Sequence, residues 1–243
     1  VCEVSSYQAE SLEHFRPQGL IWTNFDEDHL DRYPTMEAYF NAKWRLVEQL
    51  SRPCLIVGES VAYWAKKFGK ELPSYAIVVK RDDAVGAPPT RSPFVSFPQQ
   101  ENYRLVRAFW EREGRSLSNL ELAAKKFNLP KHRLQLVAEH GKASFWNDSK
   151  ATNFASALAA LKAFKEPVYW IGGGKSKGGD VEHFADTVAG TVREAFLIGE
   201  TAPQLAERFR RGRVDSHVCQ SLPEAVHMAY SRVQQPSVVL LSP

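Results

Sequence analysis

Cysteine is scarce in this sequence, and the three that occur form no recognisable pattern. Cys2, Cys54 and Cys219 are odd in number and widely spaced, whereas zinc sites and disulfide frameworks need closely spaced or evenly numbered cysteines. A reducing compartment is therefore expected. The chain also has no long apolar run and no signal-peptide pattern.

Excess charge of either sign is also missing. The formal net charge is +3, from 31 basic and 28 acidic residues, which is too small to indicate a nucleic-acid partner. With 243 residues, 44% of them hydrophobic, the chain has enough apolar material for one large domain or two ordinary ones. No internal repeat or low-complexity segment interrupts it, so a globular protein is expected.

Short apolar runs alternate with helical patterns in the first half of the chain. Thr35 can cap a helix in which apolar residues recur at helical spacing from Met36 to Leu50. The proline-rich stretch 81–98 has little periodicity, so a loop or weak edge strands are expected there. Buried strands are predicted at 19–24, 53–58 and 74–80, and further helices at 102–113 and 118–127.

The pattern restarts near residues 129–130, where we place a boundary between domain 1–129 and domain 130–243. Residues 134–148 predict a β-hairpin that turns at His140–Gly141. The strand–helix alternation that follows predicts parallel β-α-β units in a doubly wound sheet. Its predicted helices are 151–165, 180–189, 202–211 and 222–233, and its predicted strands are 167–174, 194–200 and 237–242.

Both ends of the sequence look like the middle of a structural element. The first residues predict a strand that begins without an initiator methionine. The last residues predict a strand that stops where a loop should follow. We therefore expect the sequence to be an internal piece of a longer protein.

Four carboxylates and a histidine crowd into residues 26–31, directly after the predicted strand 19–24. Parallel α/β sheets place ligands beyond the carboxyl ends of their strands, and oxygen ligands suit Mg²⁺. The segment therefore predicts a site for a hard divalent cation. A polar loop with helix-capping acids is the alternative interpretation of the same residues.

Lys43 interrupts the apolar stripe of the helix that follows. Positions 36, 40, 43, 47 and 50 share one helical face, and all but Lys43 are apolar. A lysine in such a place snorkels, pairs with an acid, or loses its proton. A neutral lysine can take up CO₂ as a carbamate, which would turn a cation into a metal-ligating anion.

Acidic and polar residues also gather at the beginning of the chain. Glu3 lies at the end of the predicted first strand, where a carboxylate is costly unless it has a cationic partner. Ser5 and Gln8 follow it and suit a polar substrate, although each of them could equally be structural.

The segment NDSKATN, residues 147–153, offers groups for an anion. Asp148 and Ser149 are expected at a helix N-terminus, where backbone N–H groups favour negative charge, with Lys150 and Thr152 as added donors. Simple helix capping by Asp148 or Ser149 is the alternative. Upstream, His132 lies at the predicted domain junction, next to Arg133, a usual place for ligand-handling residues.

The glycine-rich loop 170–180 resembles a P-loop only in part. Its G-K-S ending would need a glycine at position 169, which is Tyr169, so we reject a P-loop. The loop can still bind anions through its N–H groups and through Lys175 or Lys177.

Together these motifs resemble those of the Mur ligases of bacterial cell-wall synthesis. The matching segments occur in the family's order along the whole chain and read EVSSYQ (3–8), DHLDRYPTMEAYFNAK (28–43), LPKHR (129–133), NDSKATN (147–153), GGKSKGGD (173–180) and LLSP (240–243). The second segment is shared with folate-polyglutamate ligases. NDSKATN is more specific and resembles the branch that adds D-glutamate.

The resemblance implies an ATP-dependent amide-bond-forming ligase of peptidoglycan synthesis. Residues 1–129 would belong to a central ATP-binding domain with a mostly parallel sheet, and 130–243 to a Rossmann-like, amino-acid-binding C-terminal domain. The implied substrates are UDP-N-acetylmuramoyl-L-alanine and D-glutamate, and the implied cofactors are ATP, two Mg²⁺ ions and a carbamylated Lys43. A cytoplasmic monomer without a nucleic-acid partner or stable membrane insertion is expected.

The resemblance also assigns roles by motif match. The catalytic residues would be Asp28, His29 and Lys43, and the metal ligands would be Glu3, His29 and carbamylated Lys43. Substrate contacts would come from Ser5, Gln8, Lys150, Thr152 and Lys177, and nucleotide contacts from Asn102, His132, Arg133 and Asp148.

This sequence departs from the family pattern in several places. The family's ATP P-loop, its N-terminal domain and the segment after Pro243 are absent, so this piece alone is expected to be inactive. Leu105 stands where the family usually has a second asparagine, and residues 86–98 match nothing in the pattern. Alternatives are another Mur or folylpolyglutamate-type ligase, a non-catalytic binding module of the same fold, and a metal-dependent phosphohydrolase.

Overall fold

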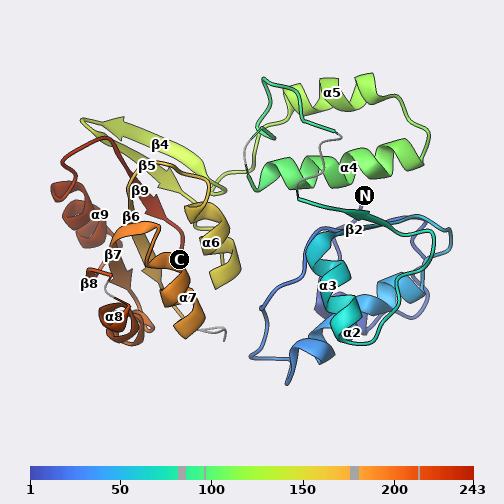
Figure 1. The fold of residues 1–243 in the computed structure, drawn as a ribbon, viewed down its shortest axis with the longest axis horizontal. Coiled ribbons are helices and arrows are strands. Elements are labelled where there is room, and N and C mark those ends of the chain that lie inside the picture. Colours follow the sequence, from blue (N-terminus) through green and yellow to red (C-terminus); the bar gives the residue numbers. More distant parts are fainter. Residues whose placement is uncertain (82–85, 96, 176–180, 213) are drawn as a thin grey trace. The chain divides into compact units, whose positions relative to one another are not determined.

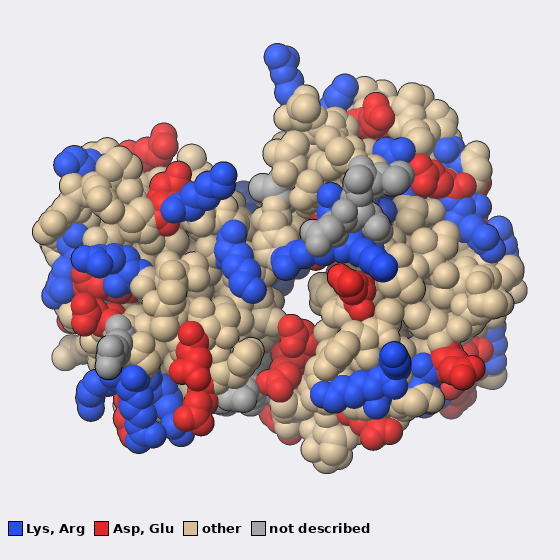
Figure 2. Space-filling model, in the orientation of Figure 1, with Lys and Arg blue, Asp and Glu red and all other residues tan. Residues whose placement is uncertain are grey.

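The computed structural model describes residues 1–81, 86–95, 97–175, 181–212 and 214–243. The chain divides into two compact units, Val1–Asn128 and Leu129–Pro243, which are described separately (Figure 1). Within the described ranges, no helix is both long and apolar enough to cross a membrane. On the face shown in Figure 2, Lys and Arg are interleaved with Asp and Glu over each unit.

The first unit is built on a small parallel sheet. Its strands are β1 (Leu20–Trp22), β2 (Leu55–Gly58) and β3 (Ile77–Val79), in the order β1-β2-β3. Its helices are α1 (Ser6–Glu10), α2 (Met36–Glu48), α3 (Glu59–Lys67), α4 (Gln99–Arg112) and α5 (Leu117–Lys126). In Figure 1, α4 lies on one side of the strands and α2 and α3 lie on the other, which explains why all of β2 is buried.

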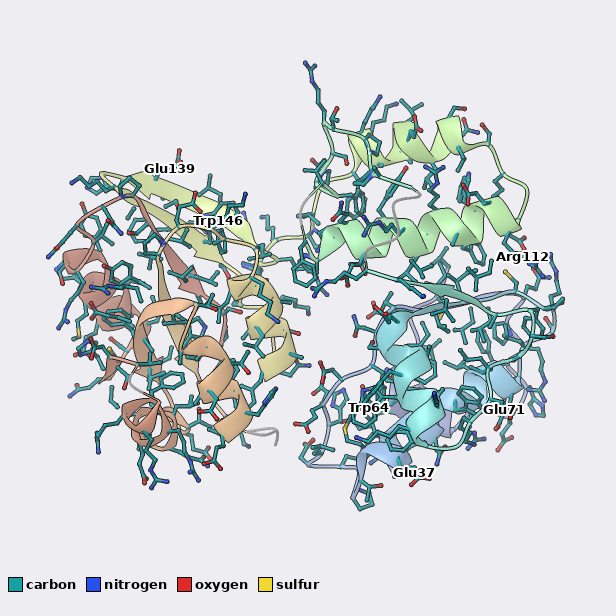
Figure 3. All side chains as sticks on the ribbon, in the orientation of Figure 1. Glu37, Trp64, Glu71, Arg112, Glu139 and Trp146 are labelled. Atoms are coloured by element: carbon teal, nitrogen blue, oxygen red, sulfur yellow. The ribbon has the colours of Figure 1, made fainter. Side chains whose placement is uncertain are left out.

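Aromatic side chains fill the core beneath α2 and α3. Phe40 is fully buried and packs against Trp22, Phe25 and Trp44 with ring centroids 4.9 to 5.6 Å apart. Trp64 of α3, labelled in Figure 3, lies against Phe25 at 5.9 Å. Large rings bury much apolar surface per residue, so this cluster holds both helices to the sheet.

The second unit is a six-stranded sheet in the order β4-β5-β9-β6-β7-β8. Among the described strands of this sheet, β4 alone runs antiparallel to its neighbour, and His140 pairs with Ala143 across a two-residue turn. The hairpin predicted at His140–Gly141 is therefore confirmed. The strands are β4 (Gln135–His140), β5 (Ala143–Asn147), β6 (Val168–Gly173), β7 (Val192–Ile198), β8 (Ser216–Val218) and β9 (Ser237–Leu241).

Helices cover both faces of this sheet. Trp170 of β6 points into the core formed with α6 (Phe154–Leu161), α7 (Val181–Val188) and α8 (Ala202–Arg211). Its neighbour Tyr169 points to the opposite core beside α9 (Leu222–Ser231). Successive strand residues point to opposite faces, and helices cover both faces of this sheet. All residues of β6 are therefore apolar. The predicted α/β fold with a mostly parallel, doubly wound sheet is confirmed.

Several elements differ from the sequence prediction. Residues 1–5 form no strand, contrary to expectation, because they pair with no neighbouring strand in the described part of the chain. Instead a short helix, α1, begins at Ser6. The helix expected over 151–165 is shorter, because Asn153 caps it and it ends at Leu161. The elements α3 and β8 were not predicted.

Candidate functional site

Lys43 brings together three elements of the first unit. It is half-buried on α2, and burial lowers the pKa of its ammonium, whereas the carboxylates of Asp28 and then Glu3 act in the opposite direction. Asp28 lies in the loop after β1 and Glu3 in the segment before α1. The charges of two carboxylates therefore act on a partly desolvated amine.

An aromatic ring forms part of the surroundings of Lys43. Its Nζ atom lies 5.3 Å from the ring centre of Tyr39, within cation–π range. Burial raises the pKa of Tyr39, so the ring remains a neutral phenol at physiological pH. Tyr39 was not among the predicted site residues, although it lies one helical turn from Lys43.

His29 is held in a strained backbone conformation beside Asp28. Its φ angle is +55°, and its N–H donates to Asp28 Oδ1 at 2.9 Å. Its Nδ1 atom lies 3.0 Å from the hydroxyl of Tyr7, and its Nε2 atom lies 3.7 Å from Asp28 Oδ2. Tyr7 thus contacts Nδ1 of His29, whereas Nε2 faces Asp28, whose charge also raises the pKa of Lys43.

Tyr7 was not among the predicted site residues. Its role emerges only in the fold, because α1 packs it against the loop that carries His29, 22 residues later. Arg32 strengthens this contact by pairing with Glu10 Oε2 at 2.6 Å and lying over the Tyr7 ring at 5.0 Å. The two segments EVSSYQ and DHLDRYP therefore form one connected structure.

Ser5 and Gln8 form a capping box at the beginning of α1. The Ser5 hydroxyl accepts the Gln8 N–H at 3.2 Å, and Gln8 Oε1 accepts the Ser5 N–H at 2.8 Å. The signature S-x-x-Q could have revealed this role in the sequence. Both residues are exposed, so they can contact a ligand only while also serving the helix cap.

The described part of the chain contains no complete, preformed metal centre. Among the residues that the structure describes, no three His, Cys, Asp or Glu side chains converge as they would around a bound ion. Glu3 itself is exposed. The predicted set of Glu3, His29 and carbamylated Lys43 includes a modified lysine, which is not one of those four residue types.

Asp148, in the second unit, does not lie at a helix N-terminus, contrary to the sequence expectation for it and for Ser149. Its backbone N–H donates to Leu241 O at 2.7 Å, so the chain is still paired with β9 at this point and α6 starts only at Phe154. Its carboxylate is buried and accepts from the Leu134 N–H and the Ser242 hydroxyl, both at 3.0 Å. Burial raises its pKa, and these two donors oppose the increase.

The segments LPKHR and NDSKATN are in direct contact. The Lys150 N–H donates to the carbonyl of His132 at 3.1 Å, and the Asn147 side-chain amide lies 3.0 Å from His132 Nδ1. His132 and Leu134 both have left-handed backbone, with φ of +66° and +42°. Each such residue costs on the order of 1–3 kcal/mol, which the surrounding bonds must offset.

The remaining predicted residues are placed as follows. Arg133, Lys150 and Thr152 are exposed on the second unit, and Lys177 lies outside the described residues. Asn102, on α4 of the first unit, donates to Gln99 Oε1 at 3.2 Å. Leu105 is buried, so the residue that departs from the family pattern belongs to the core.

Comparison with known protein families matches both units. The Mur ligase middle domain matches residues 1–107, and the Mur ligase glutamate ligase domain matches residues 132–243. The UDP-N-acetylmuramoylalanine–D-glutamate ligase of Caldicellulosiruptor bescii is 30% identical over 277 residues, an alignment that covers 100% of this chain. The chain spans 58% of the length of that relative.

Solved structures show the same fold. The MurF of Acinetobacter baumannii matches 97% of this chain, and 58% of its own, with a TM-score of 0.70 at 16% identity. The MurF ligase of Thermotoga maritima, solved in complex with ADP, matches 93% of this chain and 58% of its own with a TM-score of 0.67 at 13% identity. With both domain patterns and the fold in agreement, this chain belongs to the Mur ligase family and carries its middle and C-terminal domains.

Proposed function

We propose that this protein is an ATP-dependent ligase that joins D-glutamate to UDP-N-acetylmuramoyl-L-alanine in peptidoglycan synthesis. The observation that best supports this proposal is the half-buried Lys43, whose pKa is lowered by burial and raised by the nearby charges of Asp28 and Glu3. D-glutamate is the favoured amine because relatives named as D-glutamate ligases align over nearly the whole chain. The C. bescii enzyme covers 100% of it at 30% identity, and the Nitrosomonas europaea enzyme covers 99% of it at 32% identity.

The proposed reaction has two steps. The substrate carboxylate attacks the γ-phosphorus of ATP, the bond to ADP breaks, and an acyl phosphate forms. The amine of D-glutamate then attacks the acyl carbon, phosphate leaves, and the amide loses the surplus proton to solvent. A positioned cationic site lowers the barrier of the first step, because negative charge accumulates on the transferring phosphoryl group.

Lys43 is proposed to act as a carbamate. A lowered pKa increases the neutral fraction of its amine, which can attack CO₂, form an N–C bond and release one proton. The product is an anion at the position on which Asp28 and Glu3 already act. Oxygen donors of this kind suit Mg²⁺, so Glu3, His29 and carbamylated Lys43 would hold the metal, with Asp28 close by.

The bound Mg²⁺ would supply charge neutralisation for the transferring phosphoryl group. The protein's own residues do the remaining work. Tyr7 orients His29 through its contact with Nδ1. Ser5 and Gln8, at the start of α1, are proposed to contact the muramoyl substrate. The proposed contacts to phosphate and D-glutamate are Lys150, Thr152 and Lys177. On the nucleotide side, the proposed contacts are Asn102, His132 and Arg133, and the buried Asp148 is proposed to support this side by accepting the Leu134 N–H next to them.

An amino-acid panel tests the proposal. Full-length protein with ATP, Mg²⁺ and UDP-N-acetylmuramoyl-L-alanine should release phosphate and form an amide only with D-glutamate. Incorporation of diaminopimelate, or of L-alanine when UDP-N-acetylmuramate is supplied, would favour a sister ligase. Binding without ATP consumption would favour a non-catalytic module, and phosphate release without any amine would favour a phosphohydrolase.

A further inference from the structure

Helix α1 is too short to be stable by itself. It has five residues, Ser6–Glu10, whereas isolated helices shorter than about 12–15 residues are marginal in water. The capping box of Ser5 and Gln8 holds its beginning, and contacts with the rest of the unit must hold its end. The position of this helix matters because it carries Tyr7, whose hydroxyl lies 3.0 Å from His29 Nδ1.

Arg45 of α2 holds the end of α1. Its guanidinium donates to the carbonyl oxygen of Glu10, the last residue of the helix, at 2.6 Å and to that of Leu12 at 3.0 Å. The side-chain amide of Gln49, one helical turn after Arg45, also donates to the Leu12 carbonyl at 3.2 Å. Carbonyls at a helix C-terminus lack partners within the helix and carry partial negative charge, so a planar cation with several donors suits this place.

Glu10 connects this end of α1 to the loop that carries His29. Its carbonyl oxygen accepts from Arg45, and its carboxylate pairs with Arg32 at 2.6 Å. Arg32 lies three residues after His29, and its guanidinium lies over the ring of Tyr7, 5.0 Å from the ring centre. Helix α1 is therefore fixed between α2 and this loop, and Tyr7 lies where it meets the loop.

We propose that Arg45 is a positioning residue, which caps α1 and thereby keeps Tyr7 in contact with His29. Residues two apart on a helix do not face each other, so Arg45 acts through α1 and not through its near neighbour Lys43. The inference rests on the proposed function only for the role of His29 as a metal ligand. The hold on α1 itself follows from the two bonds that the guanidinium donates to backbone carbonyls.

The first experiment measures amide hydrogen exchange in the unliganded full-length protein. Arg45→Met keeps the length of the side chain but removes its donors, so exchange over residues 6–12 should become at least about tenfold faster. Arg112→Met is the matched control and should leave this exchange unchanged, because Arg112 also donates to a backbone carbonyl of the first unit, that of Pro53, at 2.9 Å. Unchanged exchange in Arg45→Met would overturn the inference.

The second experiment tests whether the hold on α1 extends to His29. In ¹⁵N NMR spectra of the unliganded protein, recorded at one fixed pH and assigned with a His29→Gln variant, Tyr7→Phe should shift the Nδ1 signal of His29. Arg45→Met should shift this signal in the same direction, because Tyr7 is no longer kept in place. A signal that stays unchanged in Arg45→Met would show that Arg45 does not position Tyr7, and the inference would be wrong.

A double-mutant cycle on Mn²⁺ affinity separates positioning from general damage to the fold. Arg45→Met should weaken Mn²⁺ binding by up to about tenfold, the loss expected when an outer-shell partner is removed. If Arg45 acts through Tyr7, the double variant with Tyr7→Phe should bind Mn²⁺ about as weakly as the weaker of the two single variants. Losses that multiply would assign Arg45 a route that bypasses Tyr7, which contradicts the proposal.

Gln49→Met is a milder variant for the case that Arg45→Met does not fold. It removes one of the three described bonds to the carbonyls of Glu10 and Leu12, so faster exchange and the shift at His29 should both appear at smaller size. If neither appears, α1 does not depend on this contact, and the inference is wrong.

Failure of the proposed function gives a different result. If wild-type protein binds no Mn²⁺, the metal assignment is wrong. Hydrogen exchange and the His29 signal then still decide whether Arg45 holds α1 and Tyr7.

Discussion

Each unit contains an ionisable group that is at least partly buried, but the surroundings of that group differ between the two units. In the second unit, Asp148 is 8% exposed and its carboxylate accepts from the Leu134 N–H and the Ser242 hydroxyl. In the first unit, Lys43 is half-buried, and its ammonium has the Tyr39 ring at 5.3 Å and the influence of Asp28 and Glu3. The carboxylate is satisfied within its own unit, whereas the amine is surrounded by groups that suit a ligand.

This difference indicates how to separate structural from functional charges. A buried charge with a full set of hydrogen bonds stabilises one conformation of the chain around it. A partly desolvated charge without such a set reduces stability and is retained for chemistry. Removing Asp148 should therefore destabilise the fold, and removing Lys43 should lower the activity without destabilising the fold.

The largest expected effect is the loss of activity in Lys43→Ala. Removing a metal-ligating group should cost more than the 10- to 100-fold typical of outer-shell partners, so turnover should fall by at least about 100-fold. Bicarbonate should not restore it, whereas short-chain carboxylates should restore part of it by filling the space. Lys67→Ala, which removes a lysine that lies over the Trp64 ring, is the control and should retain full turnover. Full activity in Lys43→Ala would end the carbamate hypothesis.

The next effect is on the stability of the second unit. Asp148→Ala leaves the Leu134 N–H without its acceptor next to a strained backbone, so unfolding should become easier by about 2–3 kcal/mol. Urea denaturation of the variant measures this change. Asp186→Ala, at an exposed position on α7, should lie within about 0.5 kcal/mol of wild type. If Asp148→Ala also lowered the free energy of unfolding by no more than about 0.5 kcal/mol, the contrast between Asp148 and Lys43 would be contradicted.

A smaller effect is expected for Tyr7→Phe, which keeps the ring but removes the hydroxyl that contacts His29 Nδ1. Because outer-shell partners orient metal-binding histidines, Mn²⁺ affinity, measured by electron paramagnetic resonance as a probe for Mg²⁺, should fall about tenfold. The apparent KM for Mg²⁺ should rise more than kcat falls. Tyr63→Phe, on the exposed side of α3, is the matched control. Unchanged Mn²⁺ affinity in Tyr7→Phe would show that His29 needs no such support.

The smallest effect concerns stability and pH. Lys43→Met completes the apolar stripe of α2, so it should stabilise the unmodified protein by about 1 kcal/mol at pH 7. Burial lowers the pKa of Lys43 in the folded chain below its ordinary 10.5, so the unfolded chain binds more protons. Wild-type stability should therefore rise relative to Lys43→Met as pH approaches 10.5 from below. Urea titrations of both variants in CO₂-free buffer measure the difference, and a constant gap would contradict the shift.

Local sequence patterns were enough to predict most of the elements. Thr35 was predicted to cap α2, and its hydroxyl does accept the Ala38 N–H at 3.1 Å. The hairpin at Gly141 follows from a turn residue between two apolar runs, a signal that depends only on neighbouring residues. The short helix α1 was missed even though S-x-x-Q at Ser5 signals it, because residues 1–8 were interpreted as a strand and a polar cluster.

Contacts between residues that are far apart in the sequence were harder to predict from sequence patterns. Asp148 was expected to serve a helix N-terminus, but pairing with β9, more than 90 residues later, keeps it in the sheet. Tyr7 gave no sequence signal, because its contact with His29 depends on how α1 packs against the loop after β1. Non-local contacts of this kind leave no periodicity for a sequence pattern to detect.

The sequence by itself determined the α/β class, the order of most elements and the chemical types of the candidate residues. Side-chain periodicity and turn chemistry act over a few residues, so they can be read along the chain. Tertiary structure decided which of these residues meet. It placed Asp28 and Glu3 around Lys43, and it used Asn147 and Asp148 to hold His132. Burial and hydrogen bonding determine the charge and the tautomer of a group, and both depend on neighbours that only folding brings together.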